Sequence, residues 1–141
     1  MAKTKQFDPS KVSIIVGPQP IGGFAKGTFI NVERSSHLWS KEVGADGEVS
    51  RTKSSDKSGR ITLKLMASSA SNDYLSALNL LDELSNGGMF PVLVKDNSGT
   101  SLYAAAEAWI EKAPNAEFSK ELTEREWVID CAILESFSGG N

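Results

Sequence analysis

Cysteine and histidine are nearly absent from this sequence, which contains one of each in 141 residues. The lone Cys131 excludes an intramolecular disulfide and any zinc site built from several cysteines, and the lone His37 excludes a histidine-rich metal cluster. No segment approaches 18 uninterrupted apolar residues, and residues 1–10 contain no apolar signal-peptide core. We therefore expect a soluble intracellular domain with neither a metal site nor a cofactor.

Catalytic motifs are missing as well. Residues 17–22 begin like a phosphate-binding loop, but Gly23-Phe24 stand where Lys-Ser/Thr is required, and two prolines remove backbone amides that would hold phosphate. No serine lies in a G-x-S-x-G motif. His37 lies in a segment, residues 35–41, that reads as a loop or an edge, and Cys131 lies in an apolar strand where a thiol acts as a small hydrophobe. We therefore expect no enzymatic activity.

Charge is distributed unevenly along the chain, although the formal net charge is only −3. Residues 1–70 carry 11 Lys and Arg against 6 Asp and Glu, a balance of +5, whereas residues 71–141 carry 4 against 12, a balance of −8. One interpretation is an ordinary solvated surface. The other is that one surface meets its complement on an identical copy, since complementary potentials set register and partner choice.

Short alternating segments in the first half predict antiparallel strands. Residues 12–16 are apolar and β-branched, residues 28–34 alternate, and the Gly- and Pro-rich stretch between them predicts a hairpin. Residues 48–53 and 60–66 form a similar pair, the second with clean alternation, joined by a loop that contains no apolar residue. We therefore predict a second hairpin over residues 47–66.

One helix is predicted at the start of the second half. Ser71 or Asn72 can cap its amino terminus, and Asn86 with the two following glycines ends it, because these residues tolerate the left-handed conformation. Its apolar residues are spaced to form one buried stripe: Tyr74, Leu75, Leu78, Leu81 and Leu84. The helix is therefore expected to pack along one side against the strands.

The remaining strands complete the predicted domain. Residues 90–95 pair with residues 102–110, and residues 121–137 form one long strand. Together the elements indicate a single domain over residues 1–141, mainly antiparallel β with one helix. Its amino-terminal residues 1–10 have few apolar anchors and are expected to form a flexible arm, and residues 138–141 a loose tail.

The middle of the chain resembles the tail-tube proteins of contractile-tailed bacteriophages. The segment Val43–Leu78 contains the V-G-x-D-G-E-V-x-R stretch, a polar loop, a G-x-I-T-L-x-L strand and an S-x-S-N-D helix start in the order found in that family. Upstream, residues 12–16 and the G-F-A-x-G turn at residues 23–27 resemble the opening strand of the family. Downstream, Trp109-Ile110 and residues 126–128 fit its later strands, so the resemblance covers most of the chain.

The resemblance implies a β-sandwich or β-barrel of antiparallel strands with one flanking α-helix, similar to the inner tube of type VI secretion. It implies a virion structural protein, made in the host bacterial cytoplasm, whose six-membered rings stack into a hollow conduit for DNA ejection inside a contractile sheath. Implied partners are further copies of the chain, the sheath, tape measure, baseplate and tail-terminator proteins, and double-stranded DNA passing without specific binding. No membrane partner is implied. Alternatives are a type VI secretion or bacteriocin tube, and a small sandwich-fold binding module.

Two sets of residues are expected to act in such an assembly. The wet face of the 47–66 hairpin is expected to supply part of the lumen wall: Glu48, Ser50, Thr52, Thr62 and Lys64. Ring stacking is expected to bring basic residues of the first half against acidic residues of the second: Lys3, Lys5, Arg51, Lys53, Lys57 and Arg60 against Glu117, Glu121 and Glu124. Because duplex DNA is densely charged and a cationic wall would retard it, the lumen is expected to be neutral to acidic.

Overall fold

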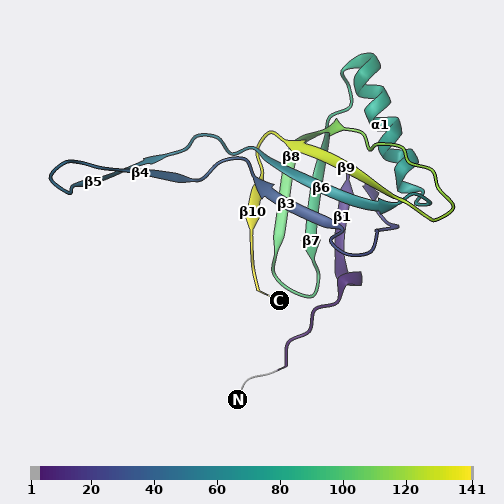
Figure 1. Cartoon of the computed structure of the whole chain (residues 1–141), viewed down its shortest axis with the longest axis horizontal. Helices are drawn as coiled ribbons and strands as arrows, with labels where there is room; N and C mark the ends of the chain where they lie inside the picture. The colour runs from purple at the N-terminus through teal and green to yellow at the C-terminus, as the bar shows by residue number, and fades with distance from the viewer. Residues whose placement is uncertain (1–3, 141) are drawn as a thin grey trace.

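Strands make up most of residues 4–140, the part of the chain that the computed structural model describes (Figure 1). In chain order the elements are η1 (Pro9–Lys11), β1 (Val12–Val16), β2 (Gln19–Pro20), β3 (Ile30–Arg34), β4 (Trp39–Val43), β5 (Val49–Lys53), β6 (Gly59–Met66), α1 (Ser71–Ser85), β7 (Phe90–Asp96), β8 (Leu102–Lys112), β9 (Glu124–Cys131) and β10 (Glu135–Phe137). The expected fold, mainly antiparallel β with one flanking helix, is confirmed.

Eight of the strands form one antiparallel sheet in the order β2-β1-β7-β8-β9-β6-β3, with β10 paired to β8. This sheet curls, so that β3, β6 and β9 cross over β1 and β7 (Figure 1). β4 and β5 form a separate two-stranded sheet. The main sheet therefore encloses a core on its inner face and leaves its outer face to polar side chains, as one-sided antiparallel sheets do.

The curled sheet is closed more completely at one end than at the other. At the closed end, the segment after β2 bridges its two edges: Ile21 N–H donates to the Ile14 carbonyl on β1, and Ala25 N–H donates to the Lys64 carbonyl on β6, each at 2.9 Å. Phe24 also forms an isolated bridge with Leu65. At the other end, where β1 begins, the edges formed by β1 and β3 are not neighbours in the sheet.

The core consists of the inward-facing residues of these strands and one residue of the helix. Fully buried side chains of large volume include Trp127, Ile14, Ile61, Leu63, Leu65, Leu75, Ile129 and Leu134. Strict alternation produces this core, as in β6, where Ile61, Leu63 and Leu65 are buried and the intervening residues are not. Among the described residues no buried polar or charged residue is found.

Helix α1 is tied to the sheet by polar side chains at its first turns. Asn72 accepts a 2.9 Å hydrogen bond from the Trp127 indole and donates to the Met66 carbonyl, while the Tyr74 hydroxyl donates to the Val16 carbonyl. The predicted capping role is wrong, because Ala70 occupies the cap position and the Ser71 hydroxyl instead accepts from the Gly22 amide. The predicted helix end at Asn86, with φ of 59°, is confirmed.

The predicted apolar stripe of α1 is only partly buried. Leu75 is buried, and Tyr74 and Leu78 pack against the core, but Leu81 and Leu84 are exposed. The helix runs past the edge of the sheet, as Figure 1 shows, so its second half has no strand beneath it. Helical spacing predicted which side of the helix faces inward, but it could not predict how far the sheet extends.

Both predicted hairpins of the first half are wrong in their pairing. β1 pairs with β7 and, through a tight turn, with β2, because Gly17 adopts a φ of 61° that turns the chain back on itself at once. β5 pairs with β4 rather than with β6, and β6 pairs with β3 and β9. The segment 35–58 is therefore an insertion within a β3–β6 hairpin, and its polar residues 54–58 form the base of this insertion rather than a turn.

The pairing predicted between residues 90–95 and 102–110 is confirmed as β7–β8, with an irregularity between Phe90 and Val92. The single strand predicted over residues 121–137 is wrong, since β9 ends at Cys131 and β10 begins at Glu135. Between them, Ala132 N–H donates to the Glu107 carbonyl and Leu134 N–H to the Lys57 carbonyl. These bonds redirect the chain so that β10 continues along β8 beyond β9.

Replacing Trp127 with Phe is expected to lower the free energy of unfolding by about 1–3 kcal/mol. The change removes the indole donor from Asn72 and leaves space beside α1, so the half-buried amide oxygen loses its partner. Urea denaturation followed by circular dichroism measures the loss. Trp39→Phe, at an exposed aromatic position, is the matched control and is expected to change stability by less than about 0.5 kcal/mol. Equal losses in the two variants would contradict the role assigned to Trp127.

Candidate assembly surfaces

The β4–β5 hairpin, called the arm (residues 39–53) from here on, projects away from the body of the protein (Figure 1). Every residue from 37 to 53 is exposed, and the two strands form a sheet of their own. An isolated two-stranded hairpin is marginally stable in water. The arm is therefore the part of the fold that receives the least support from its own chain.

The two faces of the arm differ in chemistry. Side chains alternate along a strand, and residues directly opposite each other share a face. One face, the cationic face, carries apolar and basic side chains: Trp39, Lys41, Val43, Val49, Arg51 and Lys53. The other, the hydroxyl face, carries Ser40, Glu42, Ser50 and Thr52. The arm is thus two-sided, with all of its cations on one side.

Local contacts hold the arm extended. The Arg51 guanidinium lies 3.8 Å from the centroid of the Trp39 ring, a cation–π distance. At the tip, Glu48 N–H donates to the Asp46 carboxylate at 3.1 Å, and Gly47 has a φ of 88° that favours glycine. The turn predicted at Asp46-Gly47 therefore lies at the tip of the arm. The strand before this turn is β4, part of which falls in the segment 35–41 discussed in the sequence analysis.

Asp56 fixes the base of the arm. Its carboxylate accepts hydrogen bonds from the Ser58 hydroxyl at 2.6 Å, the Ser36 hydroxyl at 2.7 Å and the Ser58 amide at 2.9 Å. These bonds lower the pKa of Asp56 from 3.8 to about 2, because each donor stabilises the ionised form. Ser36 and Ser58 come from the two sides of the insertion, so one carboxylate joins both chains where they leave the sheet.

The outer face of β3, β6, β9 and β8, called the polar face, is organised in rows across the strands. Register places Glu33, Arg60, Asp130 and Trp109 side by side in one row. The next row holds Asn31, Thr62, Val128 and Lys112. Two further rows pair Lys64 with Glu126 and Met66 with Glu124. The polar face is therefore a continuous surface on four neighbouring strands.

Carboxylates surround the cations of the polar face. Arg60 forms ion pairs with Glu111 at 2.9 Å and with Asp130 at 3.3 Å, and these partners, with Asp130 first, raise its pKa. Lys64 lies opposite Glu126 in the register. Among the residues of these rows and the ion-pair partner Glu111, five carboxylates stand against three cations, a net charge of −2: Glu33, Glu111, Glu124, Glu126 and Asp130 against Arg60, Lys64 and Lys112.

The expected lumen residues do not lie on one hairpin. Thr62 and Lys64 are half-buried residues on the polar face, whereas Ser50 and Thr52 lie on the hydroxyl face of the arm and Glu48 lies in its turn. Sequence analysis joined them because β5 precedes β6 in the chain. The structure separates them because β5 takes its partner from β4.

The expected stacking charges are distributed over several surfaces. Arg51 and Lys53 lie on the cationic face of the arm, Lys57 lies at its base, and Arg60 is held in ion pairs within its own chain. Lys5 lies in the exposed residues before η1, and Lys3 lies outside the described residues. Of the acidic residues, Glu124 is on β9, and Glu117 and Glu121 are on the loop between β8 and β9.

The loop of residues 113–123 forms an acidic surface with exposed apolar side chains. Phe118 is 85% exposed and Leu122 is 62% exposed. The Arg125 guanidinium lies 5.6 Å from the Phe118 ring centroid. This loop lies at the opposite side of the body from the arm (Figure 1). The protein therefore carries, on one side, an arm with one cationic face and, on the other side, the loop that holds Glu117 and Glu121.

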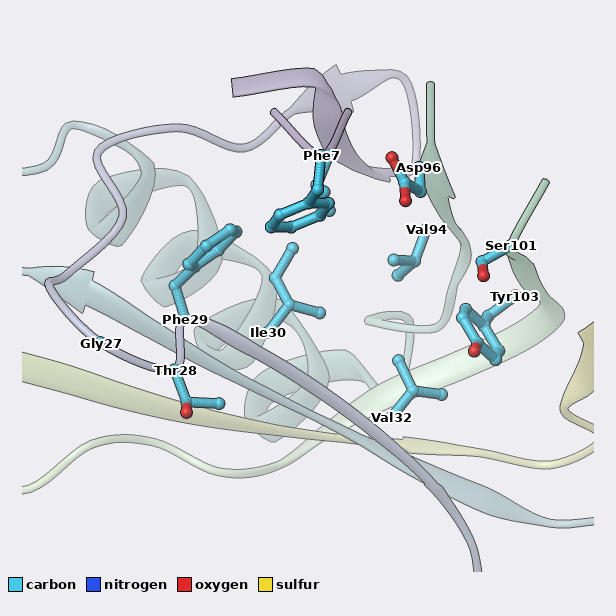
Figure 2. A pocket seen from close by; sticks show the side chains of 11 residues that line it. Phe7, Gly27, Thr28, Phe29, Ile30, Val32, Val94, Asp96, Ser101 and Tyr103 are labelled. Atoms are coloured by element: carbon cyan, nitrogen blue, oxygen red, sulfur yellow. The ribbon is translucent and has the colours of Figure 1, made fainter. Parts of the chain in front are cut away.

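A groove of about 330 Å³ opens where the sheet is least closed. Figure 2 shows Ile30, Val32, Val94 and Tyr103 pointing into a shared space, with Phe7 above Ile30 and beside Phe29. Asp96 and Ser101 lie at its margin and supply its polar groups. This groove, called the Phe7 groove, was not found by sequence analysis, because its walls come from four separate parts of the chain.

The described residues provide surfaces rather than a reaction centre. Burial raises the pKa of the Cys131 thiol to about 11, so it is a poor nucleophile at neutral pH. Within residues 4–140, no group of three or more His, Cys, Asp or Glu side chains is arranged to hold a metal ion. In the same range, no helix is long and apolar enough to cross a bilayer.

Comparison with known sequences identifies a bacteriophage family and a bacteriophage relative over most of the chain. The family described as bacteriophage PhiTE tail tube protein matches residues 21–139. Structural protein ORF10 of Pseudomonas phage KPP10 is 35% identical over 147 aligned positions, which span 99% of this chain and 85% of that protein. A 30% identical match to cytosolic aldehyde dehydrogenase 1 of Elephantulus edwardii spans 24% of that enzyme, too small a share to carry an enzymatic activity to this chain.

Comparison with solved structures identifies the same fold. The tube-terminating cap of the anti-feeding prophage aligns with a TM-score of 0.61 at 9% identity, covering 98% of this chain and 95% of the cap. The sheath/tube terminator of the PVC extracellular contractile injection system aligns with 0.61 at 12% identity, covering 97% and 100%. A chain of the PVC sheath–tube complex aligns with 0.58 at 13% identity, covering 94% and 92%.

The Asp56 carboxyl is expected to titrate near pH 2, and Ser58→Ala is expected to move its midpoint up towards 3.8. Because the folded pKa lies below the unfolded value, the contribution of Asp56 is present above pH 4 and is lost as the pH falls through about 2. Carbon-detected NMR of the carboxyl group measures the midpoint. Ser55→Ala, at the exposed neighbouring serine, is the control, and an equal shift in that variant would contradict the assignment.

Proposed function

Because this chain belongs to the bacteriophage PhiTE tail tube protein family and is therefore a structural protein of the virion rather than an enzyme, we propose that six copies close into a ring and that rings stack into a hollow tube. The tube conducts double-stranded DNA outward inside a contractile sheath. The observation that carries this proposal is the arm, an unsupported hairpin whose cationic face is complementary to an acidic surface on the opposite side of the same protein.

Contacts between the two opposite sides are heterologous, since a surface on one copy meets a different surface on the next. Such contacts close into rings or continue as helical arrays, depending on the rotation between copies. In the proposed assembly, Arg51 and Lys53 of the arm, with Lys57 at its base, face Glu117, Glu121 and Glu124 of another copy. Lys5, in the exposed residues before η1, is proposed to belong to the same set of stacking charges, and Lys3 lies outside the described residues. Complementary potentials of this kind fix register more than they add affinity.

The polar face is proposed as the main wall of the lumen, with Thr62 and Lys64 among its residues. The hydroxyl face of the arm, with Ser50 and Thr52, extends the wall onto a neighbouring copy, and Glu48 lies where the arm ends. Support comes from the chemistry of these surfaces: the polar face has a net charge of −2, and its cations lie beside carboxylates. A wall of this kind gives phosphates no unpaired row of cations to bind.

The partners of the tube are proposed from the similarity of this chain to the solved structures. The similar solved chains come from a sheath–tube complex, a sheath/tube terminator and a tube-terminating cap. We assign sheath and terminator contacts to this protein, and with them contacts to tape measure and baseplate proteins. The same surfaces would serve a contractile injection system, which is the class that the two PVC structures represent. The 35% identity to a phage structural protein favours the phage tail.

Assembly of the purified protein is expected to weaken as salt rises from about 0.05 to 1 M, because screening shortens the reach of the arm charges. The double variant Arg51→Glu/Lys53→Glu is expected to remain folded but to form no tubes at 0.05 M salt. Negative-stain electron microscopy measures tube formation, and circular dichroism checks the fold. Ser50→Glu/Thr52→Glu, on the hydroxyl face, is the control and is expected to assemble. Tubes of unchanged length in the Arg51/Lys53 variant would contradict the electrostatic contact.

Tubes of the double variant Glu33→Lys/Glu126→Lys, two polar-face positions outside the proposed stacking contact, are expected to retain short duplex DNA and to protect it from nuclease, whereas wild-type tubes release it. The reason is that these substitutions convert the polar face to a cationic wall. Co-sedimentation at low salt followed by nuclease digestion measures both effects. Glu83→Lys, on α1, is the control: DNA bound to the outside of the tube stays digestible. Digestible DNA in the double variant would contradict a lumen position for the polar face.

A further inference from the structure

The junction between α1 and β7 contains the dipeptide Asn86-Gly87, and Asn86 is the one asparagine in the sequence that a glycine follows. Asn86 caps the carboxyl end of α1 in the left-handed conformation, with a φ of 59° and a ψ of 20°. Figure 1 shows the chain leaving the far end of α1 here and returning to β7. Both residues of the dipeptide are exposed, so water reaches the Asn86 side chain and the peptide bond after it.

Hydrogen bonds hold the chain on both sides of the Asn86–Gly87 peptide bond. Asn86 N–H donates to the Asp82 carbonyl at 3.0 Å, and Gly88 N–H donates to the Asp82 carboxylate at 3.2 Å. In the described part of the chain, no hydrogen bond is found from the Gly87 N–H. The plane of this peptide can therefore rotate without breaking either neighbouring bond, since glycine accepts the backbone angles on both sides of the rotation.

Rotation of the peptide plane brings the Gly87 nitrogen to the side-chain carbonyl carbon of Asn86. The nitrogen loses its proton and attacks this carbon, so that a new C–N bond forms while the C–N bond of the side-chain amide breaks and ammonia leaves. The product is a five-membered succinimide ring. One water molecule then opens the ring at either of its two carbonyl groups. The products are aspartate and isoaspartate, and the whole conversion consumes one water molecule and releases one ammonia molecule.

Comparable positions elsewhere in the chain are held more firmly. Asn97, in the turn after β7, donates a side-chain hydrogen bond to the Lys11 carbonyl at 2.8 Å. At the tip of the arm, Asp46-Gly47 could form the same ring. There, however, the Gly47 N–H, which contains the attacking nitrogen, donates to the Gly44 carbonyl at 2.9 Å. The absence of such a bond therefore distinguishes the Asn86–Gly87 peptide from the Asp46–Gly47 peptide.

A carboxylate at position 86 is unfavourable for the end of α1. The last turn of the helix contains no basic residue, and it already contains Asp82 and Glu83. A negative charge at the carboxyl end of a helix opposes the helix dipole, and a second carboxylate four residues after Asp82 repels it. Conversion to aspartate alone is therefore expected to weaken the last turn of α1.

Isoaspartate disturbs the junction further, because it lengthens the main chain by one carbon just before a tightly packed residue. Gly88 is buried, and even an added β-carbon there would lie 2.7 Å from the Leu78 carbonyl oxygen. Two residues later, Phe90 begins β7 and is itself buried in the core. The extra carbon is therefore expected to displace either the last turn of α1 or the start of β7.

We propose that Asn86-Gly87 is a site of spontaneous modification, at which the protein converts its own asparagine to aspartate and isoaspartate and so loosens the junction between α1 and β7 as it ages. The reactants are the chain itself and water. The isoaspartyl carboxylate that forms is a substrate for the class of methyltransferases that esterify this group. The inference goes beyond the proposed self-assembly and does not rest on it, because every group it uses lies within a single copy.

Ageing of the purified, unassembled protein at mildly alkaline pH tests the site. Peptide mass spectrometry measures conversion at each asparagine, and an isoaspartyl methyltransferase with a labelled methyl donor measures isoaspartate. Conversion at Asn86 is expected to be about tenfold or more faster than at Asn97, a difference of about 1.4 kcal/mol in activation free energy. The rate is expected to rise with pH, because the attacking nitrogen has to lose its proton. Equal rates at the two asparagines overturn the proposal.

Gly87→Ala is the matched control variant. The φ of Gly87 lies outside the left-handed region, and an added β-carbon would meet only the Ser85 hydroxyl, at 3.2 Å, so the fold is expected to be retained. The added methyl group hinders the attacking nitrogen, and conversion at Asn86 is therefore expected to slow about tenfold or more. Circular dichroism checks the fold, and a rate equal to that of the wild type overturns the proposal.

Thermal melting before and after ageing tests the loosened junction. The converted wild-type protein is expected to melt about 3 °C or more below the fresh protein. Gly87→Ala aged in parallel is expected to keep its melting temperature. Asn86→Asp introduces the charge without the longer main chain, and it is expected to show a smaller loss than the converted protein. A converted wild-type protein that melts at its original temperature overturns the loosening of the junction.

Discussion

The arm has no hydrophobic core of its own, and this constraint determines how the rest of the structure must be understood. It is an insertion between β3 and β6, which pair as though the intervening residues were a simple turn. Ordering a long insertion costs conformational entropy, and a two-stranded ribbon with every residue exposed recovers little of it. The contacts around Asp56 and the packing of Arg51 on Trp39 shape the arm but do not bury it. Its compensating burial has to come from another molecule.

The body of the protein, in contrast to the arm, has a hydrophobic core of its own. Alternation in β6 and β9 places Leu63, Trp127 and Ile129 in a closed core, and the same alternation places Thr62, Lys64 and Glu126 outside. The lumen wall proposed for this outer face needs such a division, because stability comes from the inner face and the outer face is free to be polar. On that outer face the Arg60 ion pairs neutralise a cation that would otherwise attract phosphate. Exposed ion pairs add little stability, so their main effect here is on the surface potential.

Sequence patterns predicted the elements better than their partners. The strict alternation in residues 60–66 was sufficient to predict a strand, and the glycine-rich segment was sufficient to predict the end of the helix. Each of these features is a local property of the backbone. Pairing is not local: the residues of β1 pair with residues of β7 that lie 76 to 84 positions away, and the Gly17 turn that follows β1 resembles any other turn in the sequence. Only part of the arm could be predicted. Asp46-Gly47 indicated its turn, but Trp39–Val43 lacks the apolar alternation of a core strand. The Phe7 groove had no signal, because no single segment contains it.

The two ends of the sheet give the molecule a direction. One end is closed within the chain by Ile21, Ala25 and the packed first turns of α1, and the other is left with Phe7 over an apolar opening. A protein with different surfaces at its two ends can exchange arms reciprocally in a two-fold dimer, or it can give its arm in one sense and receive one in the same sense. The second arrangement is the geometry of the proposed rings and stacked tubes. In that proposal, the polarity of the assembly follows from where a single chain leaves its own sheet open.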